Sequence, residues 1–218
     1  MKLLEAQLRL ERVVNRPFRE ILSESNSDLI IDKGRAGKAL EIVLGLQNSP
    51  NPKDFEDGEL KTNKCNRYGN PLETVFICQI MSMIDDLIMQ KPFEESHLCE
   101  KISNMLYVPV CKEGAPGDWY FLPCIHVDLK DQKFSSLLNI WREDYYSICS
   151  QLRHHIENGR DGFIHTSNGR HIQVRSKDSK PYHPIYSRFY NKNVSNKNHA
   201  FYFQKEFVFE IKRRFSLD

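Results

Sequence analysis

The chain of 218 residues has no run of about 18 apolar residues, so we expect no segment to span a membrane. We also expect no secretory signal, because charged residues interrupt the first apolar ones. The six cysteines form neither a CxxC pair nor a Cys/His pair at zinc-finger spacing. Such scattered cysteines predict reduced, mostly buried thiols in a cytoplasmic protein.

A strong charge of either sign is also missing. The net charge is +2, which is too small to indicate nucleic-acid binding by itself, so any basic surface must be local. Hydrophobic residues make up 40% of the chain and charged residues 28%, as in ordinary globular proteins. This length allows one sizeable core or two small lobes.

The most informative stretch is DFEDGELKT, residues 54–62. Glu59, Leu60 and Lys61 alternate polar, apolar and polar, which predicts a strand with Glu59 and Lys61 on one face. Two carboxylates and an ammonium at one place suit a hard divalent metal such as Mg²⁺, with a lysine that can polarise the attacking water. This Asp…Glu-x-Lys pattern is typical of phosphodiester-cleaving nucleases, although Glu-x-Lys is also common on solvent-exposed edge strands.

A helix is predicted from about Arg35 to Leu44, with Gly45 as its stop. Lys33 and Arg35 stand near its start, where free amide groups favour a phosphate, although a solvated basic end fits equally well. Glu41 lies between apolar neighbours, and a carboxylate there needs a partner. We therefore expect Glu41 either to pair with a lysine or arginine or to face the metal site.

Residues 71–79 are rich in β-branched and aromatic side chains, which predicts a second strand. The turn-forming residues 66–70 precede it, so we expect the two strands to form a hairpin that carries the Glu59/Lys61 face.

Further along the chain, four more features are predicted. They are strands over 105–111 and 120–127, a long helix over 134–157, and a long loop over about 178–198. The helix is the clearest, because six apolar residues fall on one stripe at helical spacing. The loop combines lysine, arginine, tyrosine and histidine, which suits DNA contact.

Seven blocks of sequence, in the same order, resemble the MutH family of mismatch-repair nicking endonucleases and the related restriction endonucleases. They are DKG…G…LE…LG from Asp32, DF…GELKT from Asp54, GNPLETVF from Gly69, LYVPV from Leu106, RED from Arg142, IQVRSK from Ile172 and FYFQKEF from Phe201. The resemblance runs from about residue 29 to the C-terminus. Collinear motifs over most of a chain are far more specific than Glu-x-Lys alone.

The resemblance implies an α/β (α+β) fold of the restriction-endonuclease type, in which helices flank a mixed sheet and two lobes surround a DNA cleft. It implies a single nuclease domain over residues 1–218. The catalytic motif would lie in about 25–112, and about 1–24 and 113–218 would form mostly the second lobe and the DNA-reading C-terminal part.

Carried over residue by residue, the resemblance assigns the active site to Glu41, Asp54, Glu59 and Lys61. Asp54 and Glu59 would bind Mg²⁺, Lys61 would assist the water, and Glu41 would support the site from its helix. The spacer between Asp-Phe and Glu-x-Lys is two residues shorter than in the family. Asp54 matches the Asp-Phe pair, and Asp57 within the spacer is the competing second metal ligand.

The resemblance also implies a set of DNA-binding residues, which comprises Lys33, Arg35, Phe76, Arg175, Lys177, Tyr202 and Lys205. Lys33 would touch the backbone, and Phe76 would lie near the DNA. Arg175, Lys177 and Tyr202 match positions that approach base edges in the family, and arginine and lysine usually read guanine in the major groove.

These features predict a Mg²⁺-dependent endonuclease that hydrolyses double-stranded DNA at a short specific site. The first hypothesis is a type II restriction endonuclease, monomeric or homodimeric, with a cognate DNA methyltransferase in the same system. The second is a MutH-like, methyl-directed strand-nicking endonuclease of mismatch repair. The third is a non-catalytic DNA-binding module, and the presence of all four active-site residues argues against it.

Overall fold

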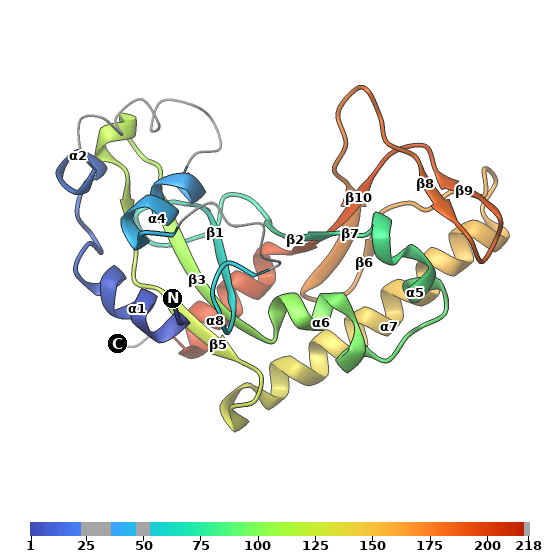
Figure 1. Cartoon of the computed structure of the whole chain (residues 1–218), viewed down its shortest axis with the longest axis horizontal. Coiled ribbons are helices and arrows are strands. Elements are labelled where there is room, and N and C mark those ends of the chain that lie inside the picture. Colours follow the sequence, from blue (N-terminus) through green and yellow to red (C-terminus); the bar gives the residue numbers. More distant parts are fainter. Residues whose placement is uncertain (23–35, 47–52, 216–218) are drawn as a thin grey trace. The chain divides into compact units, whose positions relative to one another are not determined.

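The computed structural model describes residues 1–22, 36–46 and 53–215, whose elements are shown in Figure 1. They form two compact units. The first unit comprises residues 1–75, 104–128 and 208–218, and the second comprises 76–103 and 129–207. This division differs from the predicted boundaries, because residues 1–22 pack with the segment that carries the catalytic motif and not with a second lobe.

The first unit is built on a mixed sheet. Strand β1 (Glu59–Cys65) pairs in parallel with β3 (Asn104–Cys111), and β3 pairs antiparallel with β4 (Tyr120–Phe121) and β5 (Ile125–Asp128). A short 3₁₀ helix (Pro116–Asp118) precedes β4. The central place of β3 explains why seven of its eight residues are buried.

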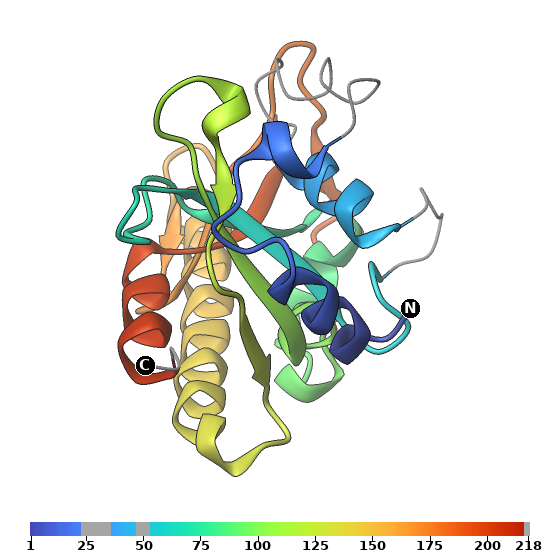
Figure 2. The ribbon, with the colours of Figure 1, turned by 90° about the vertical axis from the view of Figure 1, so that its left-hand side faces the viewer.

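Helices cover this sheet on both faces, as Figure 2 shows. Helices α1 (Leu3–Glu11), α2 (Phe18–Ile21) and α4 (Ala36–Leu44) share one hydrophobic core with β3, and α8 (Lys205–Phe215) lies on the opposite face. The predicted end of α4 is confirmed, since Gly45 follows it with φ of +70°.

The predicted hairpin between residues 59–62 and 71–79 is wrong. Strand β2 (Val75–Gln79) lies beside β10 (His199–Phe203) in a different sheet, and β1 takes β3 as its partner. Only an isolated antiparallel bridge joins Cys65 to Pro71. The apolar run of β3 is the reason, because pairing with it buries one whole face of β1 in the first unit.

The second unit contains a sheet in the order β2-β10-β7-β6 and a separate β8-β9 hairpin. The remaining strands are β6 (Ser167–Asn168), β7 (Ile172–Ser176), β8 (Ile185–Ser187) and β9 (Lys192–Ser195). Its helices are α5 (Ile84–Ile88), α6 (His97–Ile102) and α7 (Ser135–Asn158), with 3₁₀ turns at Met81–Met83, Phe93–Glu95 and Gln132–Phe134. The β8-β9 hairpin occupies part of the segment that was predicted as one long loop.

The predicted helix 134–157 is confirmed as α7, and its apolar stripe is buried. All six cysteines are free, and five of them are buried. In the part of the chain that the structure describes, no helix has the length and apolar character needed to cross a membrane.

One carboxylate interrupts the buried stripe of α7. Asp144 accepts backbone N–H groups of Arg170 at 2.6 Å, His171 at 2.7 Å and Ile172 at 2.9 Å, so α7 holds the start of β7. Gly169 makes this approach possible, since a Cβ atom there would lie 2.3 Å from a carboxylate oxygen of Asp144.

We therefore expect Gly169→Ala to destabilise the protein by roughly 1–3 kcal/mol, because the added methyl group must push Asp144 off its three donors. Gly117→Ala is the matched control, since a Cβ there meets its nearest neighbour at an ordinary 3.7 Å. Urea unfolding of both variants measures the difference. Equal stability of the two variants would contradict the proposed role of Asp144.

Candidate active site

Strand β1 places Glu59 and Lys61 on one buried face, as the alternation predicted. Glu59 is 2% exposed and Lys61 is 8% exposed. The Lys61 ammonium nitrogen lies 2.8 Å from the Glu59 Oε2 oxygen. A buried ion pair of this kind has a restricted geometry, so the ammonium is held at a defined place on the sheet.

Asp54 joins this pair from the segment before β1. One of its carboxylate oxygens accepts the Leu60 N–H at 2.9 Å. Although the residue is exposed at the surface, its carboxyl group is partly desolvated and lies within hydrogen-bonding reach of Glu59. Burial, followed by the charge and hydrogen bond of Glu59, raises the pKa of Asp54, while the Leu60 N–H and the charge of Lys61 oppose the shift.

The competing carboxylate, Asp57, is engaged elsewhere. Its Oδ1 oxygen accepts the Leu3 N–H at 2.8 Å, in the first turn of α1, and its backbone carbonyl accepts the side-chain amide of Asn104 at 2.7 Å. A carboxylate at a helix N-terminus satisfies a free amide and complements the helix dipole. Asp57 therefore anchors α1 to the loop before β1, and this geometry favours Asp54 as the second metal ligand.

Glu41 lies on α4 and pairs with a lysine, which is the first of the two alternatives expected from the sequence. Its Oε2 oxygen lies 3.0 Å from the Lys38 ammonium, one helical turn earlier, and the Glu41 side chain is 36% exposed. Within residues 1–22, 36–46 and 53–215, no three His, Cys, Asp or Glu side chains are grouped so as to hold a metal ion. The pair Asp54 and Glu59 is thus the candidate metal site, and the role of Glu41 in it stays a prediction.

Four of the predicted DNA-binding residues meet in the second unit. Three lie on the neighbouring strands β2, β7 and β10, and Lys177 directly follows β7. The Phe76 and Tyr202 rings lie edge to face with their centroids 5.7 Å apart. The Arg175 guanidinium lies 4.3 Å from the centroid of Tyr202, and the Lys177 ammonium lies 3.3 Å from that of Phe76. We call these four residues the aromatic–cation cluster.

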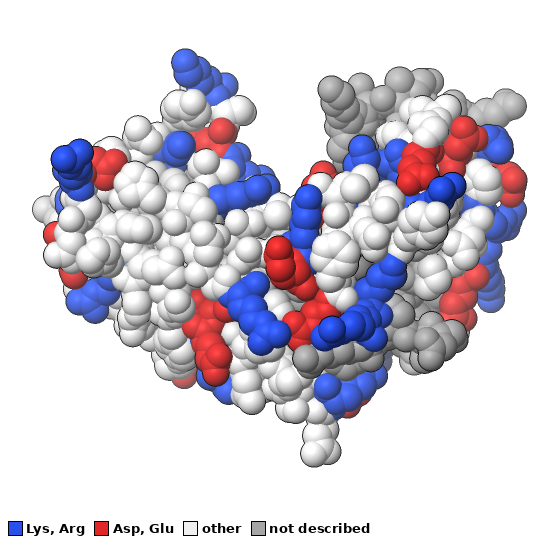
Figure 3. Space-filling view, turned by 180° about the vertical axis from the view of Figure 1, so that it is seen from behind, with Lys and Arg blue, Asp and Glu red and all other residues white. Residues whose placement is uncertain are grey.

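The aromatic–cation cluster offers both charge and an apolar surface, since Phe76 is 37% exposed. Partial burial lowers the pKa of Lys177. On the face seen in Figure 3, Lys and Arg are interspersed with Asp and Glu. Lys205 is exposed at the start of α8, and Lys33 and Arg35 lie outside the described residues.

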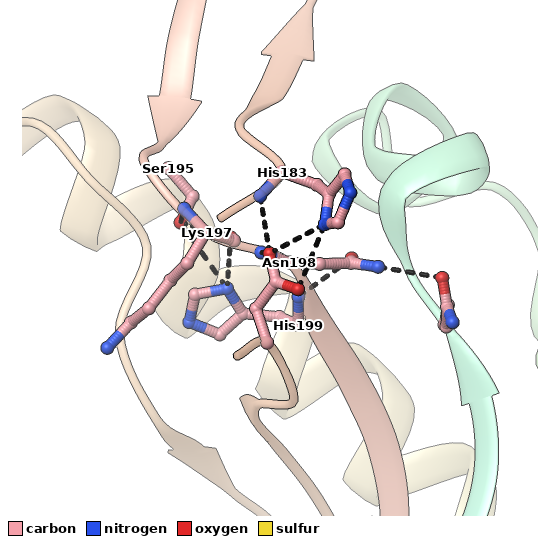
Figure 4. Close-up of polar contacts among 7 residues, drawn as sticks. His183, Ser195, Lys197, Asn198 and His199 are labelled. Atoms are coloured by element: carbon pink, nitrogen blue, oxygen red, sulfur yellow. Dashed lines mark hydrogen bonds and ion pairs between the residues drawn. The ribbon is translucent and has the colours of Figure 1, made fainter. Parts of the chain in front are cut away.

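The sequence did not reveal how the segment after Lys177 is held. In its anchor, the Asp178 carboxylate accepts the backbone N–H groups of His183 at 2.5 Å and Asn198 at 3.0 Å. These bonds lower the pKa of Asp178 to about 2. Figure 4 shows how His183 and Asn198 lie close together. The Asn198 carbonyl in turn accepts the Lys177 N–H at 3.0 Å. The signal in the sequence was an aspartate directly after Lys177, since aspartate readily accepts nearby backbone amides.

Comparisons with known proteins give the family of the chain. The family model described as DNA mismatch repair enzyme MutH matches residues 45–116, which contain β1 and β3. The chain is 30% identical over 205 residues to the DNA mismatch repair protein MutH of Buchnera aphidicola subsp. Baizongia pistaciae, with 89% of each chain covered. The chain belongs to the MutH family.

Two more relatives are similar to this chain over most of its length. Identity is 29% to the DNA mismatch repair protein MutH of Haemophilus ducreyi, with 86% of this chain and 81% of the relative covered. It is 28% to that of Histophilus somni, with 98% and 96% covered.

Membership in the MutH family confirms the resemblance found in the sequence, and the mixed α/β architecture agrees with the predicted fold class. The names of the relatives support the mismatch-repair hypothesis more than the restriction hypothesis, which was placed first on sequence grounds. A DNA cleft between two lobes stays a prediction.

Proposed function

We propose that this protein is a Mg²⁺-dependent endonuclease that nicks one strand of double-stranded DNA at a short specific site, in methyl-directed mismatch repair. The observation that carries the proposal is the convergence of Asp54, Glu59 and Lys61 on one face of β1 in a chain of the MutH family. The proposal replaces the restriction hypothesis, because the similar proteins bear mismatch-repair names.

The residues present fit a magnesium ion. Asp54 and Glu59 lie within hydrogen-bonding reach of each other, and the negative charge of Glu59 contributes to the raised pKa of Asp54, so a cation between the two carboxylates is favoured. Mg²⁺ typically takes one or two protein carboxylates and completes its shell with waters and phosphate oxygens. When bound, the ion supplies charge neutralisation at the phosphate and a more acidic water.

Lys61 supplies a positive charge in addition to that of the proposed metal ion. Its ammonium is held by Glu59 at 2.8 Å, and burial around it leaves little water to screen its charge. A fixed ammonium in such a place can orient the attacking water and stabilise the negative charge that develops on the phosphate. Asp54 and Glu59 would therefore hold the metal, and Glu59 also orients the lysine.

The aromatic–cation cluster is the proposed DNA-reading part. Arg175 and Lys177 carry donors that suit the guanine edge in the major groove, and each lies over an aromatic ring that fixes its direction. The Asp178 anchor limits the movement of Lys177 through Asn198. A restrained cation binds a base edge more tightly than a mobile one, because less entropy is lost on binding.

The test is cleavage of supercoiled plasmid DNA with and without Mg²⁺, in unmethylated, hemimethylated and fully methylated forms, followed by sequencing of the ends. The expected result is a nick on the unmethylated strand of hemimethylated DNA at one short sequence. Double-strand cleavage of unmodified DNA alone would favour a restriction endonuclease. Binding without cleavage of any long DNA would favour a non-catalytic module.

Replacing Lys177 with alanine is expected to lower the preference for the specific site by roughly 1–3 kcal/mol, that is, about 5- to 150-fold in Kd, with little change on random DNA. Fluorescence anisotropy without Mg²⁺ measures both affinities. Lys133→Ala is the matched control, since it removes a lysine of the same unit that is 58% exposed and outside the aromatic–cation cluster. Equal loss on specific and random DNA would assign Lys177 to the backbone instead.

A further inference from the structure

The buried face of β1 offers Lys61 two partners and not one. Glu59 stands two residues before it and Asn63 two residues after it, so all three side chains project from the same face. Each partner is about 6.6 Å from Lys61 along the strand. A lysine side chain can reach either one, yet the Lys61 ammonium lies at Glu59, 2.8 Å from its carboxylate.

The amide of Asn63 is occupied on both sides. Its Oδ1 oxygen accepts the hydroxyl of Tyr107, and its Nδ2 donates to the backbone carbonyl of Glu73 at 3.1 Å. Asn63 is 5% exposed and Tyr107 is 1% exposed, so water does not readily compete for these groups. Burial raises the pKa of Tyr107, which keeps its hydroxyl protonated and able to donate.

Tyr107 also stands next to Lys61. The two residues face each other in the parallel register of β1 and β3, and their side chains share one face of the sheet. From this place the Tyr107 hydroxyl reaches forward along β1 to Asn63. The tyrosine thus lies beside the lysine and engages the acceptor that would draw the lysine away from Glu59.

We propose that Tyr107 is a positioning residue for Lys61. By donating to Asn63, it satisfies one lone pair of the amide oxygen and so weakens the competition of that oxygen with Glu59 for the Lys61 ammonium, which stays beside Asp54 and the proposed metal site. The inference rests on the proposed nuclease function. The physical reason is that a buried acceptor left without its donor is costly, so an unsatisfied Asn63 oxygen would be stabilised by drawing the Lys61 ammonium away from Glu59.

The first test is Tyr107→Phe, which removes only the hydroxyl. The expected result is a roughly tenfold lower single-turnover rate of Mg²⁺-dependent cleavage with unchanged Kd for DNA, since Lys61 acts on the reaction and not on binding. Tyr145→Phe is the matched control. It removes another buried tyrosine hydroxyl, which donates to the Lys91 carbonyl at 2.9 Å, and should lower thermal stability without changing the rate.

The second test separates positioning from mere structural support. In the double variant Tyr107→Phe with Asn63→Leu, the competing amide oxygen is gone together with the hydroxyl. We expect the double variant to cleave faster than Tyr107→Phe, approaching the wild-type rate, because Glu59 is again the only partner for Lys61 on that face. A purely structural role predicts a double variant as slow as the single one or slower, and that result would overturn the proposal.

A third measurement does not depend on cleavage. The NMR signal of the Lys61 ammonium, assigned through its loss in Lys61→Arg, should move in Tyr107→Phe and return in the double variant. An unmoved signal, or a wild-type rate for Tyr107→Phe, refutes the positioning role while the nuclease function stands. If the wild-type protein cleaves no DNA, the nuclease function fails, and the NMR signal still decides whether Tyr107 directs Lys61.

Discussion

Replacing Lys61 with alanine is expected to lower Mg²⁺-dependent DNA cleavage about 10²- to 10³-fold while leaving the affinity for DNA unchanged. The ammonium is held by Glu59 on the buried face of β1, where its charge is poorly screened. It should therefore stabilise charge in the transition state much more than it stabilises bound DNA. Single-turnover cleavage and fluorescence anisotropy measure the two quantities separately.

The loss of Lys61 also leaves Glu59 buried without its cation, so Lys61→Ala should unfold at a lower temperature than the wild type. Lys61→Gln keeps a hydrogen-bond donor for Glu59 and serves as a second inactive variant that is easier to fold. Lys64→Ala is the matched control, because Lys64 lies on the opposite face of the same strand. Wild-type cleavage by either Lys61 variant would defeat the assignment of the active site.

The second large effect is expected from a pair of aspartates three residues apart. Asp54→Asn should abolish cleavage at ordinary Mg²⁺ concentrations, because it removes one of two carboxylates that fit the metal. Asp57→Asn should keep the cleavage rate and lower the free energy of unfolding by roughly 0.5–2 kcal/mol, because Leu3 loses a charged acceptor at the start of α1.

Cleavage at increasing Mg²⁺ concentration and urea unfolding distinguish the two roles. The opposite pattern, with Asp57→Asn inactive and Asp54→Asn active, would make Asp57 the second metal carboxylate and would leave Asp54 as the residue that stabilises the loop through Leu60.

The raised pKa of Asp54 also gives cleavage a defined dependence on pH. The metal-binding form is the carboxylate, so activity should decline as pH falls through a value above the ordinary 3.8 of aspartate. Higher Mg²⁺ concentration should move this decline to lower pH, because metal and proton compete for the same oxygens. Cleavage rates measured against pH at several Mg²⁺ concentrations test this, and a decline insensitive to Mg²⁺ would show that another group titrates.

The sequence by itself determined those features that depend on neighbours along the chain. The alternation at residues 59–61 specified one face for Glu59 and Lys61, and the apolar stripe at helical spacing specified α7. Glycine at position 45 marked the end of α4. Ordered motifs over most of the chain identified the MutH family. Periodicity and turn chemistry are local properties, so they can be recognised without a three-dimensional structure.

Only the tertiary structure decided which distant groups meet. The turn before Pro71 predicted a hairpin, but β1 pairs with β3, about 45 residues further along the chain, a strand whose residues are almost all buried. The tertiary structure also brings the first turn of α1 to Asp57 through the Leu3 N–H, a long-range contact that supports the proposed difference between Asp54 and Asp57. Which strands pair over long distances depends on how all apolar surfaces of the folded protein are buried together, so a local sequence pattern does not specify it.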